Sequence, residues 1–163
     1  EIIDPEEYRV GQRDHSWGTR NMAKLDFWIW TCLQFEDTNV CGWIFEDNEG
    51  EIVYSDGAIL PEHRQNPVHI DSIDHDITYR DESGYLLPEE AQLYFEDEAG
   101  ETREIDVDPN DYIIWYEGED YLDVDQFSKF TWGDDEGFGI FEIVHFENME
   151  EQWKESTWTA MGE

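Results

Sequence analysis

The chain has 163 residues, 43 of them Asp or Glu and only 9 Lys or Arg, and its formal net charge is -34. This length suits a single domain over residues 1–163, and an aromatic content of 15% excludes a disordered acidic tail, because disordered chains are poor in aromatic residues. The scarcity of positive charge argues against binding to DNA, RNA or an anionic membrane, since each requires a basic patch on the protein.

Apolar and polar residues alternate with a period of two along most of the chain, which predicts β-strands. Clusters of Asp, Asn, Ser and Gly at 47–50 and 55–57 predict turns, and the first hairpin has its predicted turn centred on Asp37 and Thr38. In the first half of the chain the predicted strands are residues 24–36, 40–47, 51–55, 58–60 and 68–80.

The second half continues this pattern after a predicted turn at 81–84. Only residues 148–156 have the composition of a helix, and that helix is short. The remaining predicted strands are residues 89–97, 101–108, 111–118, 127–133 and 137–148. Nine or ten strands at regular spacing predict an all-β fold, either an antiparallel barrel or a sandwich.

Both faces of the first predicted hairpin are apolar. An antiparallel sheet with one wet face would alternate polar and apolar residues, so this ribbon is expected to be covered on both sides. One cover is the interior; the other is a helix, a second domain or a second subunit, unless the whole is a thick sandwich core. One face carries Trp28, Trp30, Cys32, Cys41, Trp43 and Phe45, and the other carries Phe27, Ile29, Leu33, Phe35, Val40 and Ile44.

The two cysteines, Cys32 and Cys41, lie in the neighbouring strands of this hairpin. The expected turn places them off opposite positions, so they are predicted to be reduced thiols in a cytoplasmic protein. No apolar run approaches about 18 residues, which argues against a membrane span, and no signal peptide is visible. Because the first residue is not Met, the sequence is interpreted as a processed form, a fragment, or the back half of a longer protein.

The acidic composition is typical of a protein from a halophile. At molar salt the Debye length falls to about 3 Å, so the repulsion between carboxylates is largely screened. We therefore expect the fold to lose stability at low salt. In such a chain the few remaining basic residues are expected to be partly buried, and Arg13 and Arg20 are the best candidates for guanidinium groups held by carboxylates or carbonyls.

The stretch "GQRDHSWGTR" at 11–20 resembles a signature, G-x-RD-x-SWG-x-R, that opens the second half of double-calycin, lipocalin-like proteins. These families include carotenoid 1,2-hydratases, AttH-like and tocopherol-cyclase-like proteins and some Diels–Alderases. Near the end, "GFGIFEIVH" at 137–145 is similar to a G-x-G-x-x-E strand late in the same half. The resemblance implies a calycin-like barrel that packs on a first barrel or, in a chain of this length, on a second copy of itself.

The resemblance also implies a role for His15 and Trp17, since a His-x-Trp pair in this motif of the hydratases is thought to act on an isoprenoid double bond with an acid on a following strand. Glu46 and Asp47 are the nearest candidates for that acid. In an extended strand the two side chains share a face, so His15 could transfer a proton and Trp17 could stabilise a cation.

A structural alternative for the same stretch is a buried polar network of Arg13, Asp14 and Arg20 that closes one end of the barrel, with Trp17 as its plug. A second constellation places His69, Asp71 and His75 on one face of the strand at 68–80. The two histidines are about 20 Å apart along a strand, too far for one ion, so no metal is predicted. No cofactor motif is present either.

Three functions follow from these features. The first is binding of a hydrophobic isoprenoid or lipid-like molecule inside the barrel. The second is an isoprenoid hydratase or cyclase in which His15 acts as the acid. The third is a structural half-barrel that supports a partner domain or a dimer. The residues predicted to line a ligand are Trp28, Trp30, Trp43, Trp115 and Trp132.

Overall fold

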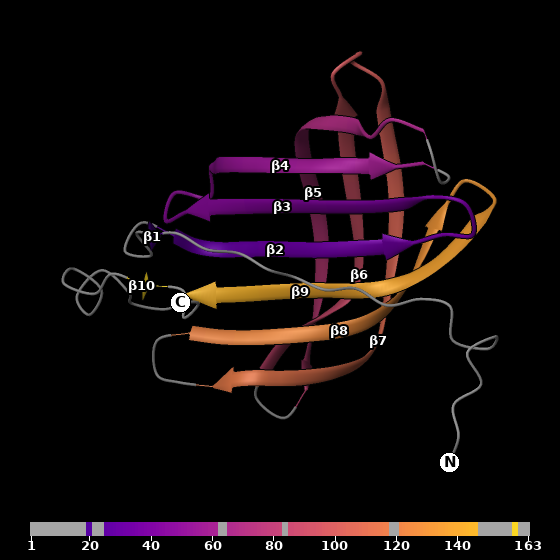
Figure 1. The fold of residues 1–163 in the computed structure, drawn as a ribbon. Helices are drawn as coiled ribbons and strands as arrows, with labels where there is room; N and C mark the ends of the chain where they lie inside the picture. Colours follow the sequence, from indigo (N-terminus) through magenta and orange to yellow (C-terminus); the bar gives the residue numbers. More distant parts are fainter. Residues whose placement is uncertain are drawn as a thin grey trace.

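The computed structural model describes residues 19–20, 25–61, 65–82, 85–117, 121–146 and 158–159. Eight strands form one closed, calycin-like barrel (Figure 1), which confirms the predicted all-β fold class. They are β2 (Leu25–Gln34), β3 (Asn39–Asp47), β4 (Ile52–Leu60), β5 (Val68–Glu82), β6 (Tyr85–Asp97), β7 (Thr102–Glu117), β8 (Tyr121–Trp132) and β9 (Asp135–Phe146). Two short strands, β1 (Thr19–Arg20) and β10 (Trp158–Thr159), pair with each other.

Each barrel strand pairs antiparallel with the next one in the chain, and β9 returns to pair with β2. Figure 1 shows β2, β3, β4 and β9 side by side, with β5 and β6 crossing behind them. The described residues contain no helix, and therefore no helix that could cross a membrane. The helix predicted at 148–156 lies outside them.

The barrel has fewer strands than predicted because two pairs of expected strands are continuous. The predicted turn at 55–57 is wrong: Gly57 pairs with Gly42 and Ile70 inside β4. A Cβ at Gly57 would lie 2.6 Å from the carbonyl oxygen of Cys41, so this glycine permits close strand packing. The predicted strands 101–108 and 111–118 are likewise joined in β7, where the gap at Pro109 is a register shift.

The turn of the first hairpin lies one residue earlier than predicted. The backbone NH of Phe35 donates to the carbonyl of Thr38 at 2.8 Å, and Cys32 stands directly opposite Cys41. The register has therefore moved by two positions, which leaves each side chain on its predicted face because the period of a strand is two. Both faces of the ribbon are apolar, as expected.

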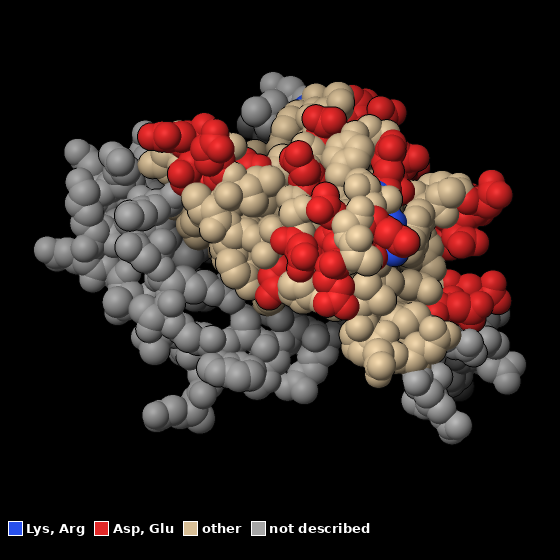
Figure 2. Space-filling model, turned by 90° about the horizontal axis from the view of Figure 1, so that it is seen from above, with Lys and Arg blue, Asp and Glu red and all other residues tan. Residues whose placement is uncertain are grey.

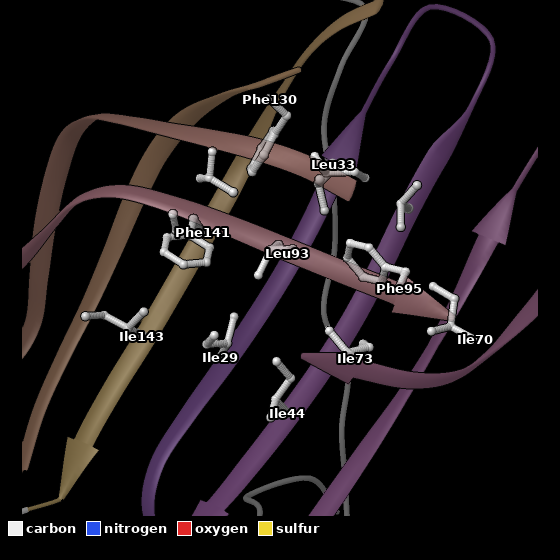
Figure 3. Packing of buried hydrophobic residues seen from close by; sticks show 14 of the residues in the cluster. Ile29, Leu33, Ile44, Ile70, Ile73, Leu93, Phe95, Phe130, Phe141 and Ile143 are labelled. Carbon is white, nitrogen blue, oxygen red and sulfur yellow. The ribbon is translucent and has the colours of Figure 1, made fainter. Parts of the chain in front are cut away.

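The inner face of the barrel is packed with its own side chains. Leu33, Phe95, Phe130 and Phe141 are fully buried, and Figure 3 shows them meeting isoleucines from neighbouring strands in one continuous core. Trp132 packs edge to face on Phe35, with ring centroids 5.8 Å apart, where β2 and β8 end. The end of the barrel with Trp132 is thus filled.

Glycines in the last strand allow the barrel to close. A Cβ at Gly137 would lie 2.6 Å from the carbonyl oxygen of Gln34, and one at Gly139 would lie 2.0 Å from that of Cys32. Any side chain there would separate β9 from β2. The two glycines of "GFGIFEIVH" are therefore explained by close packing at the seam between the last and the first barrel strand.

Two hairpin turns are built in the same way. Asp47 accepts hydrogen bonds from the backbone NH groups of residues 49 and 51, and Asp97 accepts them from residues 99 and 101, at 2.9 to 3.1 Å. Gly50 and Gly100 follow with φ of 77° and 76°, which other residues rarely adopt. Short polar side chains that bond their own backbone are typical turn formers.

The surface is strongly acidic, and acids are spread over the face in Figure 2. Three basic side chains are described. Arg103 donates to Asp97 at 2.7 Å and Lys129 pairs with Glu136, while Arg80 donates to the carbonyl of a proline at 3.2 Å. All three are partly buried and bonded to oxygen. For Arg13 and Arg20 the same was predicted, but their side chains lie outside the described residues.

Candidate functional site

Polar side chains gather on the inner face at one end of the barrel, where β2 and β8 begin and β3 and β9 end (the left end of these strands in Figure 1). They belong to strands far apart in the sequence, and aromatic rings lie among them. The members are Phe27 of β2, Glu46 of β3, His75 and Tyr79 of β5, and His145 of β9. We call these five residues the mouth cluster.

A bulge in β5 decides which histidine faces inward. The register of β5 against β6 shifts between Ile70 and Ser72, and both Ile70 and Ile73 are buried. Even-numbered side chains of β5 therefore point inward before the bulge, and odd-numbered side chains point inward after it. The prediction that His69 and His75 share a face with Asp71 is wrong for this reason: His69 lies outside the barrel and His75 lies inside.

His75 is held by Glu46. Its Nε2 lies within hydrogen-bond distance of Glu46 Oε1, and the two side chains are only 15% and 17% exposed. The other ring nitrogen, Nδ1, is buried and has no hydrogen-bond partner among the described residues. A carboxylate on Nε2 holds a proton there, which leaves Nδ1 of the neutral ring as a base and Nδ1–H of the charged ring as an acid.

The hydrogen bond between Glu46 and His75 forms because β5 separates from β4 after a short ladder. Only three residue pairs join β4 to β5, Gly57 to Ile59 with Val68 to Ile70. Beyond them β5 continues along β6 alone on its paired side, and its side chains reach those of β3 across the interior. This geometry brings Glu46 and His75 together, although 29 positions separate them in the chain.

Aromatic rings surround the pair. The Phe27 ring centroid lies 5.4 Å from that of His75 and 4.8 Å from that of His145. The Tyr79 ring lies 5.6 Å from His145. Burial, and then the negative charge of Glu46, raise the pKa of Tyr79 to about 12, so its phenol is a neutral donor at physiological pH. The mouth cluster thus combines two imidazoles, one carboxylate, one phenol and apolar ring faces.

A second buried polar group lies on the inner face of β8. Gln126 is fully buried, and its Nε2 donates to the carbonyl of Pro88 at 3.2 Å. Its Oε1 has no hydrogen-bond partner among the described residues. A buried acceptor without a donor is costly, so a water or a ligand hydroxyl would be stabilised here.

The structure places the predicted ligand-binding tryptophans away from the mouth cluster. Trp28, Trp30 and Trp43 point to the outer side of the wall, opposite the buried Phe27, Ile29 and Ile44. There Trp28 packs on Phe45 and Phe146 and donates to Glu142 at 3.0 Å. In these positions they could contact a ligand only on the outside of the barrel. Trp132 lies at the filled end, and the side chain of Trp115 lies outside the described residues.

The residues of the opening motif are not placed. Arg13, Asp14, His15 and Trp17 lie outside the described residues, and Arg20 is described only by its backbone pairing with Trp158. Their predicted roles therefore stay predictions. Among the described residues, no three His, Cys, Asp or Glu side chains lie close enough to hold a metal ion.

The outer wall also carries a close pair of acids. Asp123 and Asp125 of β8 point outward on positions opposite Val144 and Glu142, and Asp123 Oδ1 is buried with no hydrogen-bond partner among the described residues. Burial, and then the charge of Asp125, raise the pKa of Asp123 to about 6. This carboxyl is destabilised in its charged form, and sequence reasoning did not single it out.

Sequence reasoning found part of the mouth cluster. It named Glu46 as a candidate for the acid that acts with His15 and Trp17, and it considered His75 as a metal ligand and rejected that role, so it did not connect the two residues. It did not select Tyr79 or His145. The signal for both was present, because each is a polar residue on the apolar face of a predicted strand, in register with buried neighbours.

Comparisons with known proteins agree with this architecture. The profile of a family described as a domain of unknown function, DUF7064, matches residues 5–147. The chain belongs to this family. The barrel of this DUF7064 protein is also similar to the crystal structure of kievitone hydratase from Nectria haematococca, with a TM-score of 0.51 and 15% sequence identity.

That similarity covers 74% of this chain and 40% of the hydratase chain, so the match spans less than half the length of the solved protein. At this identity it establishes a lipocalin-like barrel and no more. No curated protein matches the DUF7064 chain.

Proposed function

We propose that the barrel binds a hydrophobic, isoprenoid-like or lipid-like molecule at the mouth cluster, and that His75 transfers a proton to or from it. The observation that carries the proposal is the arrangement of His75, whose Nε2 is held by Glu46 while its buried Nδ1 has no partner among the described residues. An imidazole fixed by a carboxylate at one nitrogen is a general acid or base at the other.

The filled end of the barrel restricts where a ligand can bind. Phe95, Phe130, Phe141 and Leu33 occupy the interior beyond the mouth cluster. A ligand would therefore reach the end of the barrel with Glu46 and His75, with its apolar part against the ring of Phe27. The ring faces of Phe27 and Tyr79 would stabilise positive charge that develops on the ligand.

Hydration is the reaction class that fits these groups and the name of the similar enzyme. The Nδ1–H of a charged His75 would give its proton to one carbon of a double bond. A water molecule would add to the other carbon and return a proton to the imidazole, so the net change is the addition of one water. Glu46 would stabilise the imidazolium before the transfer and again once water has returned a proton to the ring.

The experiment compares two histidines of one strand. The protein at molar KCl is incubated with farnesol, geranylgeraniol or all-trans-retinol, then examined by native mass spectrometry for bound ligand and by chromatography for products heavier by one water. We expect His75→Gln to lower turnover by about 100-fold or more. The matched control His69→Gln, which changes an exposed ring held by Asp56 and Asp71, should keep wild-type turnover.

Two results would separate the parts of the proposal. If the wild type binds none of the three compounds, ligand binding at the mouth cluster is wrong for this class of molecule. If His75→Gln binds and converts a ligand as the wild type does, the assignment of His75 is wrong. In that case His15 and Trp17, whose catalytic role stays a proposal from the opening motif, become the next residues to replace.

A supporting half-barrel is the second candidate function, and the outer wall favours it. Phe127 and Phe138 are 49% and 44% exposed and stack with ring planes 8° apart. Together with Trp30 and Trp43 they place four large apolar side chains on the outer side of β2, β3, β8 and β9. A partner domain or second copy would cover this wall, and analytical ultracentrifugation at molar salt tests for the second copy.

A further inference from the structure

Cys32 and Cys41 are the two cysteines of the chain, and their side chains are in contact. They stand directly opposite each other in β2 and β3, and their Sγ atoms are 2.8 Å apart. Both are free thiols. Because a disulfide bond is about 2.05 Å long, the two sulfur atoms need to approach by only about 0.8 Å to bond.

The backbone register places the pair where a disulfide fits. The Phe35 NH donates to the Thr38 carbonyl at 2.8 Å, so these two residues form a hydrogen-bonded pair. Pairs alternate in type along an antiparallel ladder, and three steps further Cys32 and Cys41 form a non-hydrogen-bonded pair. In such pairs the Cα atoms are about 4.5 Å apart and the side chains approach each other, within the range that a disulfide spans.

The two thiols differ in access and in acidity. Cys32 is 8% exposed, and Cys41 is more exposed. The hydrogen bond between the two thiols lowers the pKa of Cys32 and raises that of Cys41, so Cys32 loses its proton first and Cys41 keeps the shared proton. An oxidant from solvent would therefore react with the more exposed Cys41 first. Cys32 is then in position to attack the mixed disulfide that forms on Cys41.

We propose that Cys32 and Cys41 are a thiol-modification site. An oxidised low-molecular-weight thiol, such as oxidised glutathione, reversibly converts the two thiols into a disulfide between Cys32 and Cys41. When the proton shared by the two sulfur atoms moves from Cys41 to Cys32, the Cys41 thiolate attacks the glutathione disulfide, which gives a mixed disulfide and releases one reduced glutathione. The Cys32 thiolate then attacks Cys41 Sγ, forms the protein disulfide and releases a second glutathione. The cysteines lose two electrons, the glutathione gains two, and the two thiol protons end on the released glutathione molecules.

The bond would link the two strands that carry Glu46 and Phe27, on the side of the wall that faces away from the mouth cluster. Trp30 and Trp43 form the next non-hydrogen-bonded pair of the same ladder. Their indoles therefore lie beside the thiols on one face. Disulfides quench nearby tryptophan fluorescence, so the emission of the protein reports the state of the pair.

The experiment uses the wild-type chain in molar KCl with oxidised glutathione, followed by alkylation and mass spectrometry. Both cysteines lie in one tryptic peptide, residues 25–64. We expect that peptide to lose two hydrogen atoms and to carry no alkyl group, the tryptophan emission to fall, and the melting temperature to rise by about 5 °C. Dithiothreitol should reverse all three changes.

Single replacements test the order of the steps. Cys32→Ser should accumulate one glutathione on Cys41, and Cys41→Ser should stay largely unmodified because Cys32 is buried. A wild type that carries glutathione on both cysteines, that forms covalent dimers, or that stays reduced under conditions that oxidise the unfolded chain would overturn the proposal. These wild-type measurements do not depend on how the variants fold, nor on the function proposed for the mouth cluster.

Discussion

His75 and Glu46 face each other inside the barrel, Nε2 against Oε1, from strands that share no ladder. Two local irregularities create this contact: β5 separates from β4 after three residue pairs, and the bulge after Ile70 turns His75 inward. The contact fixes which nitrogen of the ring carries the proton in the neutral state. It makes the tautomer of His75 the most direct readout of the candidate site.

The first prediction concerns that tautomer. In the neutral form of the wild-type ring the ¹⁵N spectrum of the imidazole should show a protonated Nε2 and an unprotonated Nδ1, because the Glu46 carboxylate accepts from Nε2. In Glu46→Gln the side-chain amide can donate to Nε2, so the fraction of the other tautomer should rise. Glu51→Gln, at an exposed turn position, serves as the control and should leave the His75 signals unchanged. A wild-type ring protonated at Nδ1 alone would contradict the contact.

The second prediction concerns Tyr79, whose pKa burial and the Glu46 charge raise to about 12 from 10.0. The folded state holds this proton more tightly than the unfolded state does. The resulting stability is fully present below pH 10 and is lost as pH rises from 10 to 12, by at most about 2–3 kcal/mol. Urea unfolding between pH 9 and pH 12 should show a steeper loss for the wild type than for Tyr79→Phe. Parallel curves for the two proteins would show that the phenol titrates normally.

The sequence predicts the strands of the barrel wall better than it predicts the candidate site. Alternation alone puts Phe27 and Ile29 on one face of the strand and Trp28 and Trp30 on the other, but because both faces are apolar it does not say which face is inward. It does not reveal that Gly57 continues a strand, since the local composition favours a turn and only the close approach of β3 and β5 explains the glycine.

The site depends on tertiary contacts that local patterns do not contain. A bulge is a one-residue event with no strong composition signal, yet the bulge in β5 separates His69 from His75 and decides which of them is inside. The pairing of Glu46 with His75 further requires that β3 and β5 meet across the interior. Sequence reasoning could therefore name both residues without joining them.

The third prediction concerns Asp123 on the outer wall. Burial and Asp125 raise its pKa to about 6 from 3.8, so the folded state prefers the protonated acid. That preference contributes stability below pH 3.8 and is lost as pH rises through 6. At pH 7.5 the replacement Asp123→Asn, which mimics the protonated form, should stabilise the protein by about 1–3 kcal/mol, and at pH 4 the gain should nearly vanish.

Urea unfolding at both pH values measures this difference. Asp111→Asn is the matched control, because it removes the same charge from an exposed position of β7. Its effect at pH 7.5 reports the general relief of negative charge and should be smaller. If Asp123→Asn destabilises the fold equally at both pH values, the carboxylate is held by an interaction that the asparagine loses.

The fourth prediction is that the stability of the fold depends on salt concentration, because the surface is strongly acidic. Asp76, Glu90, Asp106 and Asp108 line one hollow of about 560 Å³ on the outer side of β5, β6 and β7. Raising KCl from 0.01 M to 1 M shortens the Debye length from about 30 Å to about 3 Å, which screens these acids from one another. The melting temperature should rise by roughly 10 °C, since self-repulsion disfavours the compact state.

A charge replacement separates screening from a general salt effect. Asp108→Asn should raise the melting temperature at 0.01 M KCl and leave it nearly unchanged at 1 M, because the repulsion that it removes is already screened there. Sucrose, which stabilises folded proteins by exclusion from their surface, should act equally on both proteins. A wild type whose melting temperature does not change with KCl would rule out salt adaptation as the reason for the net charge of -34.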